Sequence, residues 1–331
     1  MAWPYANGPL HLGHVAGNCL PADIQYKYER MRGRRVLMLS GSDEHGTPIT
    51  VTADETGKSP QAVVDENHDA IFASLVELGC SWGQKLDRRG VEYGGALYGR
   101  TSDPRHHELV QDILLELHEN GFLIQETMEQ FCSVADDGGI KFLPDRYVHG
   151  VCPACSAEGA RGDQCDACGA TYEANELKDP VSKLNPEIPV EIRETDHLFF
   201  RLDLLQEDLE THAASRRSTW KPNVRAMTQN WLNMGLRPRA VTRDIEWGVK
   251  IPLDDEVWGE KRVYVWFDAV QGYLTCARIW SERIAEESGS ESDIWRRWWM
   301  DSGNLRHIYF MGKDNILSLI HISEPTRRTP I

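Results

Sequence analysis

Two histidines near the start of the chain have the residue type and spacing to bind phosphate. His11 and His14 flank Gly13, and Asn7-Gly8-Pro9 precedes them, so the segment predicts a turn that opens onto a helix. A helix start offers free backbone N–H groups and the positive end of the dipole, which favour an anion. Gly13 would let a nucleotide approach closely. We therefore expect an ATP site here; two ordinary surface histidines are the alternative.

Four cysteines have the spacing of a metal site. They occur as Cys152-x2-Cys155 and, nine residues later, Cys165-x2-Cys168. Each pair can bind a metal from one turn, and two pairs complete a tetrahedral thiolate site for zinc. Because four sulfur ligands leave no open position, such a zinc would be structural rather than catalytic. Unligated thiols are the alternative.

A third candidate follows a short apolar run. Residues 36–39 predict a buried parallel strand, and the polar loop 40–46 after it contains Asp43 and His45. Ligands of open α/β sheets bind where strands end in such loops, so this loop and the histidine turn could share one crevice. A carboxylate there suits an ammonium group, although Asp and His are also ordinary turn residues.

Hydrophobic patterning predicts the elements that must position these residues. Helices are expected over 15–31 and 61–78, and a further helix ends at Asn120-Gly121. The apolar face of that helix is formed by Leu109, Ile113, Leu114 and Leu117.

The pattern changes in the second half of the chain. From about 125 to 250, short strands with Gly and Pro punctuation indicate an insertion. The apolar runs 262–268 and 307–314 predict two further strands that end in carboxylate-bearing loops, and 286–292 predicts a solvated linker.

Composition sets limits on the class of protein. A chain of 331 residues with 41% hydrophobic content and 11 Trp can hold two domains, or one domain with a large insertion. No apolar run approaches the roughly 18 residues of a membrane span, and no leader precedes the first motif, so we expect a cytoplasmic protein that does not bind membranes. The net charge of −15 argues weakly against nucleic-acid binding.

Several motifs, in order along the chain, resemble one family. PYANGPLHLGH is similar to the HIGH motif of methionyl-tRNA synthetases, which are class I aminoacyl-tRNA synthetases. GSDEHGTPI, the cysteine set preceded by FLPDRYVHG, YVWFDAVQGY and FMGKDN match the same family. The HIGH element alone leaves leucyl, isoleucyl and valyl relatives open, whereas the combination points to the methionine enzymes.

The resemblance implies a fold and a division of the chain. The fold is α/β, a Rossmann-like catalytic domain with a parallel sheet, split by a connective-peptide insertion that contains a zinc knuckle. The first catalytic half is expected over residues 1–104 and the second over 259–315. The insertion between them spans 105–258, with its knuckle at about 144–178, and a tail unlike the family spans 316–331.

The resemblance also implies an activity and its residues. Methionine and ATP, with Mg²⁺, would give methionyl-adenylate and pyrophosphate, and the methionyl group would pass to the 3′-terminal adenosine of tRNA(Met). The implied catalytic residues are His11 and His14, and the implied ATP residues are Gly13, Gly312 and Asp314. Methionine would meet Ala2, Trp3, Tyr5, Asp43, Trp266, Ala269 and Tyr273, and one structural zinc would bind Cys152, Cys155, Cys165 and Cys168.

The chain departs from the family pattern at several positions. Trp3 stands where many members have Leu, Val270 where many have Pro, and Leu319 where a His is usual. The strand that usually precedes the first motif, the KMSKS loop and the helical anticodon-binding domain are not in this sequence. We therefore expect a fragment of the catalytic domain, cut at both ends, with impaired adenylate formation.

Two other functions fit part of the sequence. Another HIGH-motif nucleotidyltransferase would lack methionine-dependent ATP–pyrophosphate exchange. A non-catalytic zinc-ribbon RNA-binding module would bind tRNA without any dependence on His11 or His14.

Overall fold

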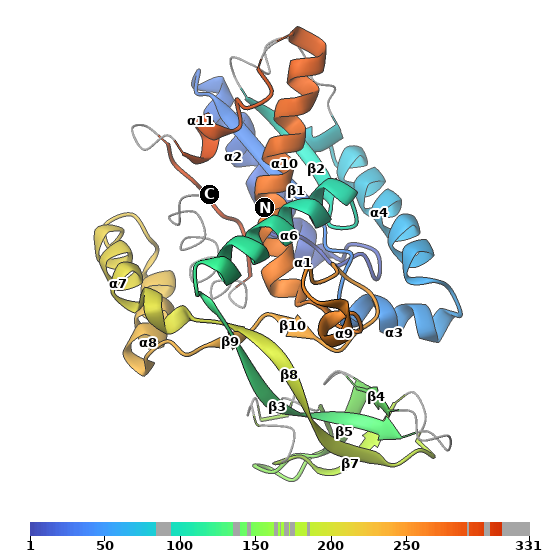
Figure 1. The fold of residues 1–331 in the computed structure, drawn as a ribbon. Coiled ribbons are helices and arrows are strands. Elements are labelled where there is room, and N and C mark those ends of the chain that lie inside the picture. Colours follow the sequence, from blue (N-terminus) through green and yellow to red (C-terminus); the bar gives the residue numbers. More distant parts are fainter. Residues whose placement is uncertain are drawn as a thin grey trace.

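A pair of parallel strands lies at the centre of the catalytic body (Figure 1). The computed structural model describes residues 1–83, 94–134, 140–143, 147–161, 165, 167–168, 172, 176–183, 186–289, 291–300 and 305–312. Strand β1 (Val36–Ser42) pairs with β2 (Gly94–Arg100) in parallel from Val36↔Gly94 to Ser42↔Arg100. The parallel strand predicted at 36–39 is confirmed. It continues through Ser42, because Ser40, Gly41 and Ser42 also pair with β2.

Helices cover this pair of strands. Helix α1 (Leu12–His14), a π-helical turn (Val15–Cys19) and α2 (Leu20–Met31) form one continuous helical stretch that packs along β1. The helices predicted over 15–31 and 61–78 are thus confirmed, the second as α4 (Pro60–Glu77). Helix α3 (Thr47–Thr56) follows the polar loop after β1.

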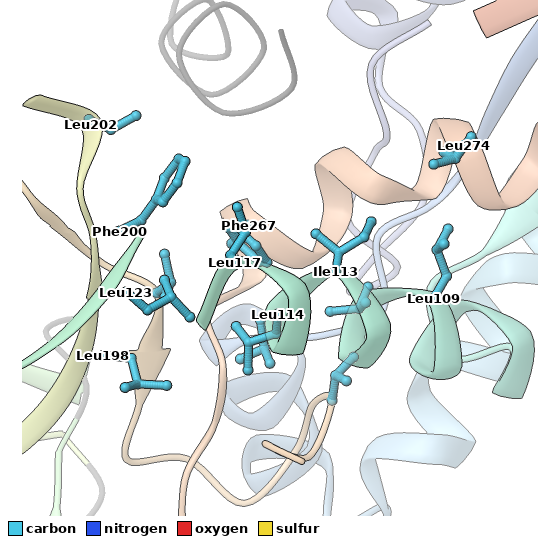
Figure 2. Packing of buried hydrophobic residues seen from close by; sticks show 14 of the residues in the cluster. Leu109, Ile113, Leu114, Leu117, Leu123, Leu198, Phe200, Leu202, Phe267 and Leu274 are labelled. Atoms are coloured by element: carbon cyan, nitrogen blue, oxygen red, sulfur yellow. The ribbon is translucent and has the colours of Figure 1, made fainter. Parts of the chain in front are cut away.

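Helix α6 (Pro104–Glu119) connects the catalytic body to the insertion. Its expected apolar face is buried against α10 (Val265–Ser288) and the base of two long strands, β3 (Leu123–Val134) and β8 (Val190–Phe200) (Figure 2). The residues that meet in this core include Leu109, Ile113, Leu114, Leu117, Leu123, Leu198, Phe200, Phe267 and Leu274.

The insertion is built on long strands, which corrects the expectation of short ones. β3 and β8 pair antiparallel from Leu123↔Phe200 to Ser133↔Val190 and extend away from the catalytic body (Figure 1). The long pairing satisfies the backbone groups of a ribbon that leaves the main core. The rest of the insertion comprises β4 (Ile140–Phe142) and β9 (Arg239–Ala240) in the same sheet, a second sheet of β6 (Glu158–Arg161), β5 (Val148–Val151) and β7 (Lys178–Ser182), and two helices that the sequence interpretation missed, α7 (Gln206–Ser215) and α8 (Pro222–Met234).

The chain returns to the catalytic body through short elements. β10 (Thr242–Arg243) pairs with β11 (Arg262–Val263), and α9 (Asp255–Trp258) lies between them in the sequence. The prediction of a strand over 262–268 is therefore wrong after Val263, because α10 begins at Val265. A helix buried on most sides has no apolar stripe, and its sequence looks like that of a buried strand.

Two smaller expectations near the end are also corrected. Residues 286–288 form the last turn of α10, which ends at Gly289 with φ of 67°, rather than a linker. Residues 305–312 form no regular strand beyond α11 (Arg296–Trp299), although Phe310 accepts a backbone hydrogen bond from Ala2 at 2.8 Å. Among the described helices, none has the length and apolar character that crossing a bilayer requires.

Candidate active site

The N-terminal segment lies directly beside the loop that follows β1. Tyr5 and Asp43 form a parallel bridge. The N–H of Asp43 donates to the carbonyl of Pro4 at 2.8 Å, and the N–H of Ala6 donates to the carbonyl of Asp43 at 2.8 Å. The segment that leads into the two histidines is thus joined by its backbone to the loop that contains Asp43.

His11 and His14 cap the helix start reciprocally. The backbone N–H of His14 donates to Nδ1 of His11 at 3.3 Å, and that of His11 donates to Nδ1 of His14 at 3.4 Å. The two rings stack with centroids 3.7 Å apart. Partial burial and then the neighbouring charge of His11 lower the pKa of His14. Since both Nδ1 atoms accept, the neutral rings carry their protons on Nε2, where they can donate to a ligand.

Gly13 is required by this stack. A Cβ atom at Gly13 would lie 2.9 Å from Cε1 of His11. The glycine that suggested close approach of a nucleotide therefore also makes room for the imidazole of the N-cap residue.

Asp43 is a buried carboxylate without a full set of partners. It is 5% exposed, and its Oδ1 has no hydrogen-bond partner among the residues that the structure describes. Burial, followed by the negative charge of Asp268, raises the pKa of Asp43 well above its usual range. A buried oxygen without a hydrogen-bond partner destabilises the fold unless a ligand, such as an ammonium group, donates to it.

The next residue, Glu44, is held by the end of β2. Nε of Arg100 donates to both carboxylate oxygens of Glu44, at 2.9 and 3.0 Å, and the hydroxyl of Ser42 donates at 2.6 Å. Ser102 also donates to this carboxylate. Nε1 of Trp247 donates to the backbone carbonyl of Glu44 at 2.6 Å.

His45 belongs to a buried network with helices α6 and α10. Nδ1 of His45 lies 2.7 Å from Oδ2 of Asp268, and Nε2 of His106 lies 2.6 Å from Oδ1 of the same carboxylate. Nδ1 of His106 meets the hydroxyl of Thr275 at 2.8 Å, and Nε2 of His107 lies 3.3 Å from Nε2 of His45. Burial, and then His45, lower the pKa of His107 to about 4.

Two of the residues expected around methionine, Trp3 and Tyr273, meet where the N-terminal segment packs on β1 and α10. The rings of Trp3 and Tyr273 meet edge to face with centroids 6.0 Å apart. Trp266, Ala269 and Tyr273 have helical spacing on α10. Trp266 is 39% exposed and its ring lies 5.9 Å from that of Tyr264, so the structure does not bring it onto the Trp3–Tyr273 pair.

The remaining expected residues are more scattered. Ala2 is buried, and the departure Val270 packs in the same small cluster as Tyr273. Gly312 is exposed, and Asp314 lies outside the described residues. A cavity of about 630 Å³ beside β1 reaches Tyr273 but is not lined by Asp43, His11 or His14. The residues expected to bind ammonium and phosphate therefore lie outside it.

The sequence interpretation missed the groups that hold the loop. Glu44, Asp268, His106, His107 and Arg100 had no assigned role. For Glu44, the available signal in the sequence was its place among three consecutive ionisable residues directly after a buried strand. Asp268 was visible inside YVWFDAVQGY, but only the fold shows that it faces His45.

The four cysteines converge as expected. Their Sγ atoms all lie within 4.8 Å of one another. Cys152 and Cys168 are 3.9 Å apart and Cys155 and Cys165 are 3.7 Å apart. A tetrahedral zinc with bonds of about 2.3 Å requires sulfurs roughly 3.8 Å apart, whereas a disulfide requires about 2.05 Å. The cluster therefore fits zinc.

Backbone geometry supports the same reading of the cluster. Cys152 and Cys155 lie in the turn between β5 and β6, where the N–H of Cys155 donates to Sγ of Cys152 at 3.4 Å. This hydrogen bond lowers the pKa of the Cys152 thiol to about 7, whereas a backbone hydrogen bond from Ala157 is outweighed by hydrogen bonds with Cys168 and Cys152, which raise the pKa of the Cys155 thiol to about 12. The hydroxyl of Tyr147 donates to Asp54 of α3 at 3.0 Å and connects the knuckle to the catalytic body.

Comparisons with known proteins agree with this arrangement. The sequence model of a family described as tRNA synthetases class I (M) matches residues 1–320. The chain is 47% identical over 321 residues to a methionine–tRNA ligase from a Nocardioides species and 44% identical over 316 residues to one from Thermoplasma acidophilum. These matches cover 96% and 95% of this chain, and 50% and 53% of the two relatives.

A solved structure shows the same fold. The crystal structure of Mycobacterium tuberculosis methionyl-tRNA synthetase bound by methionyl-adenylate matches with a TM-score of 0.65 and 22% identity, over 98% of this chain and 53% of that one. The chain thus spans about half the length of the relatives that it matches. From its motifs, its fold and the family match over 320 residues, the chain belongs to the class I tRNA synthetases of the methionine type.

Proposed function

We propose that the chain forms the methionine-activating site of a methionine–tRNA ligase. The supporting observation is Asp43, a buried carboxylate whose Oδ1 has no partner among the described residues and whose backbone pairs with Tyr5 in the segment that leads to His11 and His14. In this reaction methionine and ATP give methionyl-adenylate and pyrophosphate. The methionyl group then passes to the 3′-terminal adenosine of tRNA(Met), a reaction we assign to the cytoplasm.

Asp43 would bind the amino group of methionine. An ammonium group satisfies the unpartnered Oδ1 and neutralises a charge that is otherwise buried at a cost. The thioether would lie along the aromatic rings of Trp3 and Tyr273, since sulfur–aromatic contacts are mildly favourable. The other residues assigned to this pocket are Ala2, Tyr5, Trp266 and Ala269.

His11 and His14 would stabilise the phosphate. An oxygen of the methionine carboxylate attacks the α-phosphorus of ATP, and the bond from that phosphorus to the bridging oxygen of pyrophosphate breaks. The exposed Nε2–H groups can donate to oxygens on which charge develops, because their Nδ1 atoms are occupied by backbone N–H groups. Gly13 lies at the same helix start, Gly312 and Asp314 are assigned to the ATP ribose and adenine, and Mg²⁺ would bind the phosphates.

Zinc would be a structural cofactor. When bound it would crosslink the two cysteine pairs and stabilise the small core around Phe131, Val148 and Leu177. The division into catalytic halves 1–104 and 259–315 around an insertion 105–258 is supported by the ribbon of β3 and β8, which leaves and returns beside α6.

Calorimetric titration with L-methionine tests the proposal on this chain. We expect saturable binding that Asp43→Asn weakens by about 30-fold or more, because loss of one partner of a buried charge pair costs about 2 kcal/mol or more. Asp244→Asn is a matched control, since it removes a partly buried carboxylate that bonds to His197 and Lys261 instead.

The outcomes separate the rival functions. Absence of methionine binding, or equal loss in both variants, would contradict the assignment. Binding of ATP without methionine would favour another nucleotidyltransferase. Binding of tRNA alone, unchanged in His11→Ala, would favour an RNA-binding module.

A further inference from the structure

Asp43, Glu44 and His45 are consecutive, yet only Asp43 has an unpartnered side-chain oxygen. Glu44 is saturated by Arg100, Ser42 and Ser102. Nδ1 of His45 is bonded to Asp268. The loop therefore has two fully used side chains and one available carboxylate.

The Asp43 carboxylate accepts a hydrogen bond from the backbone N–H of His45, whereas the side chains of Arg100 and His45 are bonded to other carboxylates. Nε of Arg100 bonds Glu44, and its Nη2 bonds Asp65 at 2.5 Å. His45 is buried and uses its Nδ1–H on Asp268, a residue 223 positions away. Without Asp268, this N–H would be a buried donor in need of an acceptor, and the carboxylate of Asp43 two residues earlier would be a strong one.

The carboxylate of Asp268 is held in its ionised form by two histidines. Burial acts to raise the pKa of Asp268, but attraction to His45 and hydrogen bonds from His106 and His45 hold it below its usual range. The ionised carboxylate only accepts, so both imidazoles donate to it. Nε2 of His45 lies 3.3 Å from Nε2 of His107, and burial, followed by His45, lowers the pKa of His107 to about 4.

The side chain of Val265 packs against the loop at Gly46. Gly46, with φ of 84°, lies so close to Val265 that a Cβ atom would be 3.1 Å from Cβ of Val265. Val265 begins α10, and Asp268 lies in the first turn of that helix. Helix α10 therefore contacts the loop through the side chain of Val265 and through the carboxylate of Asp268.

We propose that Asp268 is a positioning residue that keeps Oδ1 of Asp43 available for the substrate ammonium group by occupying the Nδ1–H of His45. This inference rests on the proposed function, since it assigns Asp43 to the amino group of methionine. Asp268 itself does not touch methionine.

The test compares methionine with 4-(methylthio)butanoate, which lacks only the amino group. Calorimetry or saturation-transfer NMR would measure both affinities in the unsubstituted chain, Asp268→Asn and the control Asp244→Asn. In Asp268→Asn we expect methionine to bind about tenfold or more weakly, with the affinity for the desamino compound unchanged. Asp244→Asn should leave the ratio of the two affinities unaltered.

A merely structural role would give a different result. If Asp268→Asn weakened both ligands equally, or left the ratio unchanged, the inference would be overturned while methionine binding itself still stood. Failure of the unsubstituted chain to bind methionine would instead contradict the proposed function.

A second measurement needs no substitution at Asp268. Nitrogen-detected histidine NMR of the unsubstituted chain should show His45 with its proton on Nδ1, both with and without methionine. Absence of the proton from Nδ1 of His45, or its loss when methionine binds, would overturn the inference even if Asp268→Asn did not fold.

Discussion

The indole of Trp3 occupies a slot that Gly272 leaves open on helix α10. A Cβ atom at Gly272 would lie 2.6 Å from Cζ2 of Trp3, and one at Gly41 on β1 would lie 2.3 Å from Cζ3. The bulky residue at position 3 is therefore accommodated by two glycines from distant parts of the sequence. The contact also places the edge of Trp3 against Tyr273.

Gly272→Ala should destabilise the chain in the presence of Trp3 and not in its absence. Alanine normally stabilises a helix interior by about 1 kcal/mol relative to glycine, but here overpacking against the indole should cost about 1–3 kcal/mol. In a Trp3→Leu background the clash is gone, so the helical gain should reappear. Denaturant unfolding of the four variants measures the coupling energy, and a value near zero would show that the slot relaxes freely.

Asp43→Asn should stabilise the unliganded chain at neutral pH. The pKa of Asp43 is raised in the folded state, so the folded chain binds this proton more tightly than the unfolded chain. Stability from this group is complete below the unfolded value of about 3.9 and is lost as pH rises toward the folded pKa, by about 1.4 kcal/mol per unit.

The asparagine variant has no ionisable group at position 43, so its stability does not decrease with pH for this reason. The stability difference between Asp43→Asn and the unsubstituted chain should thus grow as pH increases over that window, as thermal unfolding at several pH values would show. A constant difference would mean that Asp43 titrates normally.

His11→Ala and His14→Ala should slow adenylate formation without changing methionine affinity. Each removes one donor expected to face the phosphate, which typically costs about 10²–10³ in rate. Single-turnover formation of methionyl-adenylate at excess protein measures this step even when it is slow. His118→Ala, on the exposed last turn of α6, is the control. Rates equal to that of the control would remove both histidines from the reaction.

The chain should contain about one zinc bound by the cysteine cluster. Cys155→Ser or Cys168→Ser should lower the zinc content, and a chelator should expose the core that contains Cys152 and Cys165 to proteolysis. Cys80→Ser, outside the cluster, should retain the metal. Elemental analysis gives the content directly. Full retention of zinc in the cluster variants would place the metal elsewhere.

Local patterns in the sequence were sufficient for part of the fold and of the candidate site. The helix that starts beside His11, the β1 strand and the cysteine pairs were predictable because caps, apolar runs and ligand spacing depend on residues close in the chain. The same patterns failed for α10 and for the β3–β8 ribbon, whose burial and length depend on distant partners.

The tertiary structure alone decided how the site is held together. Asp43 could be identified as a candidate from its place after a strand, but only the fold shows that its Oδ1 is buried without a partner among the described residues. Asp268 and Arg100 reach the loop only after α10 and β2 pack beside β1. Sequence spacing determines which residues share a turn or a helix face, whereas long-range packing determines which charges are paired and which remain available for a substrate.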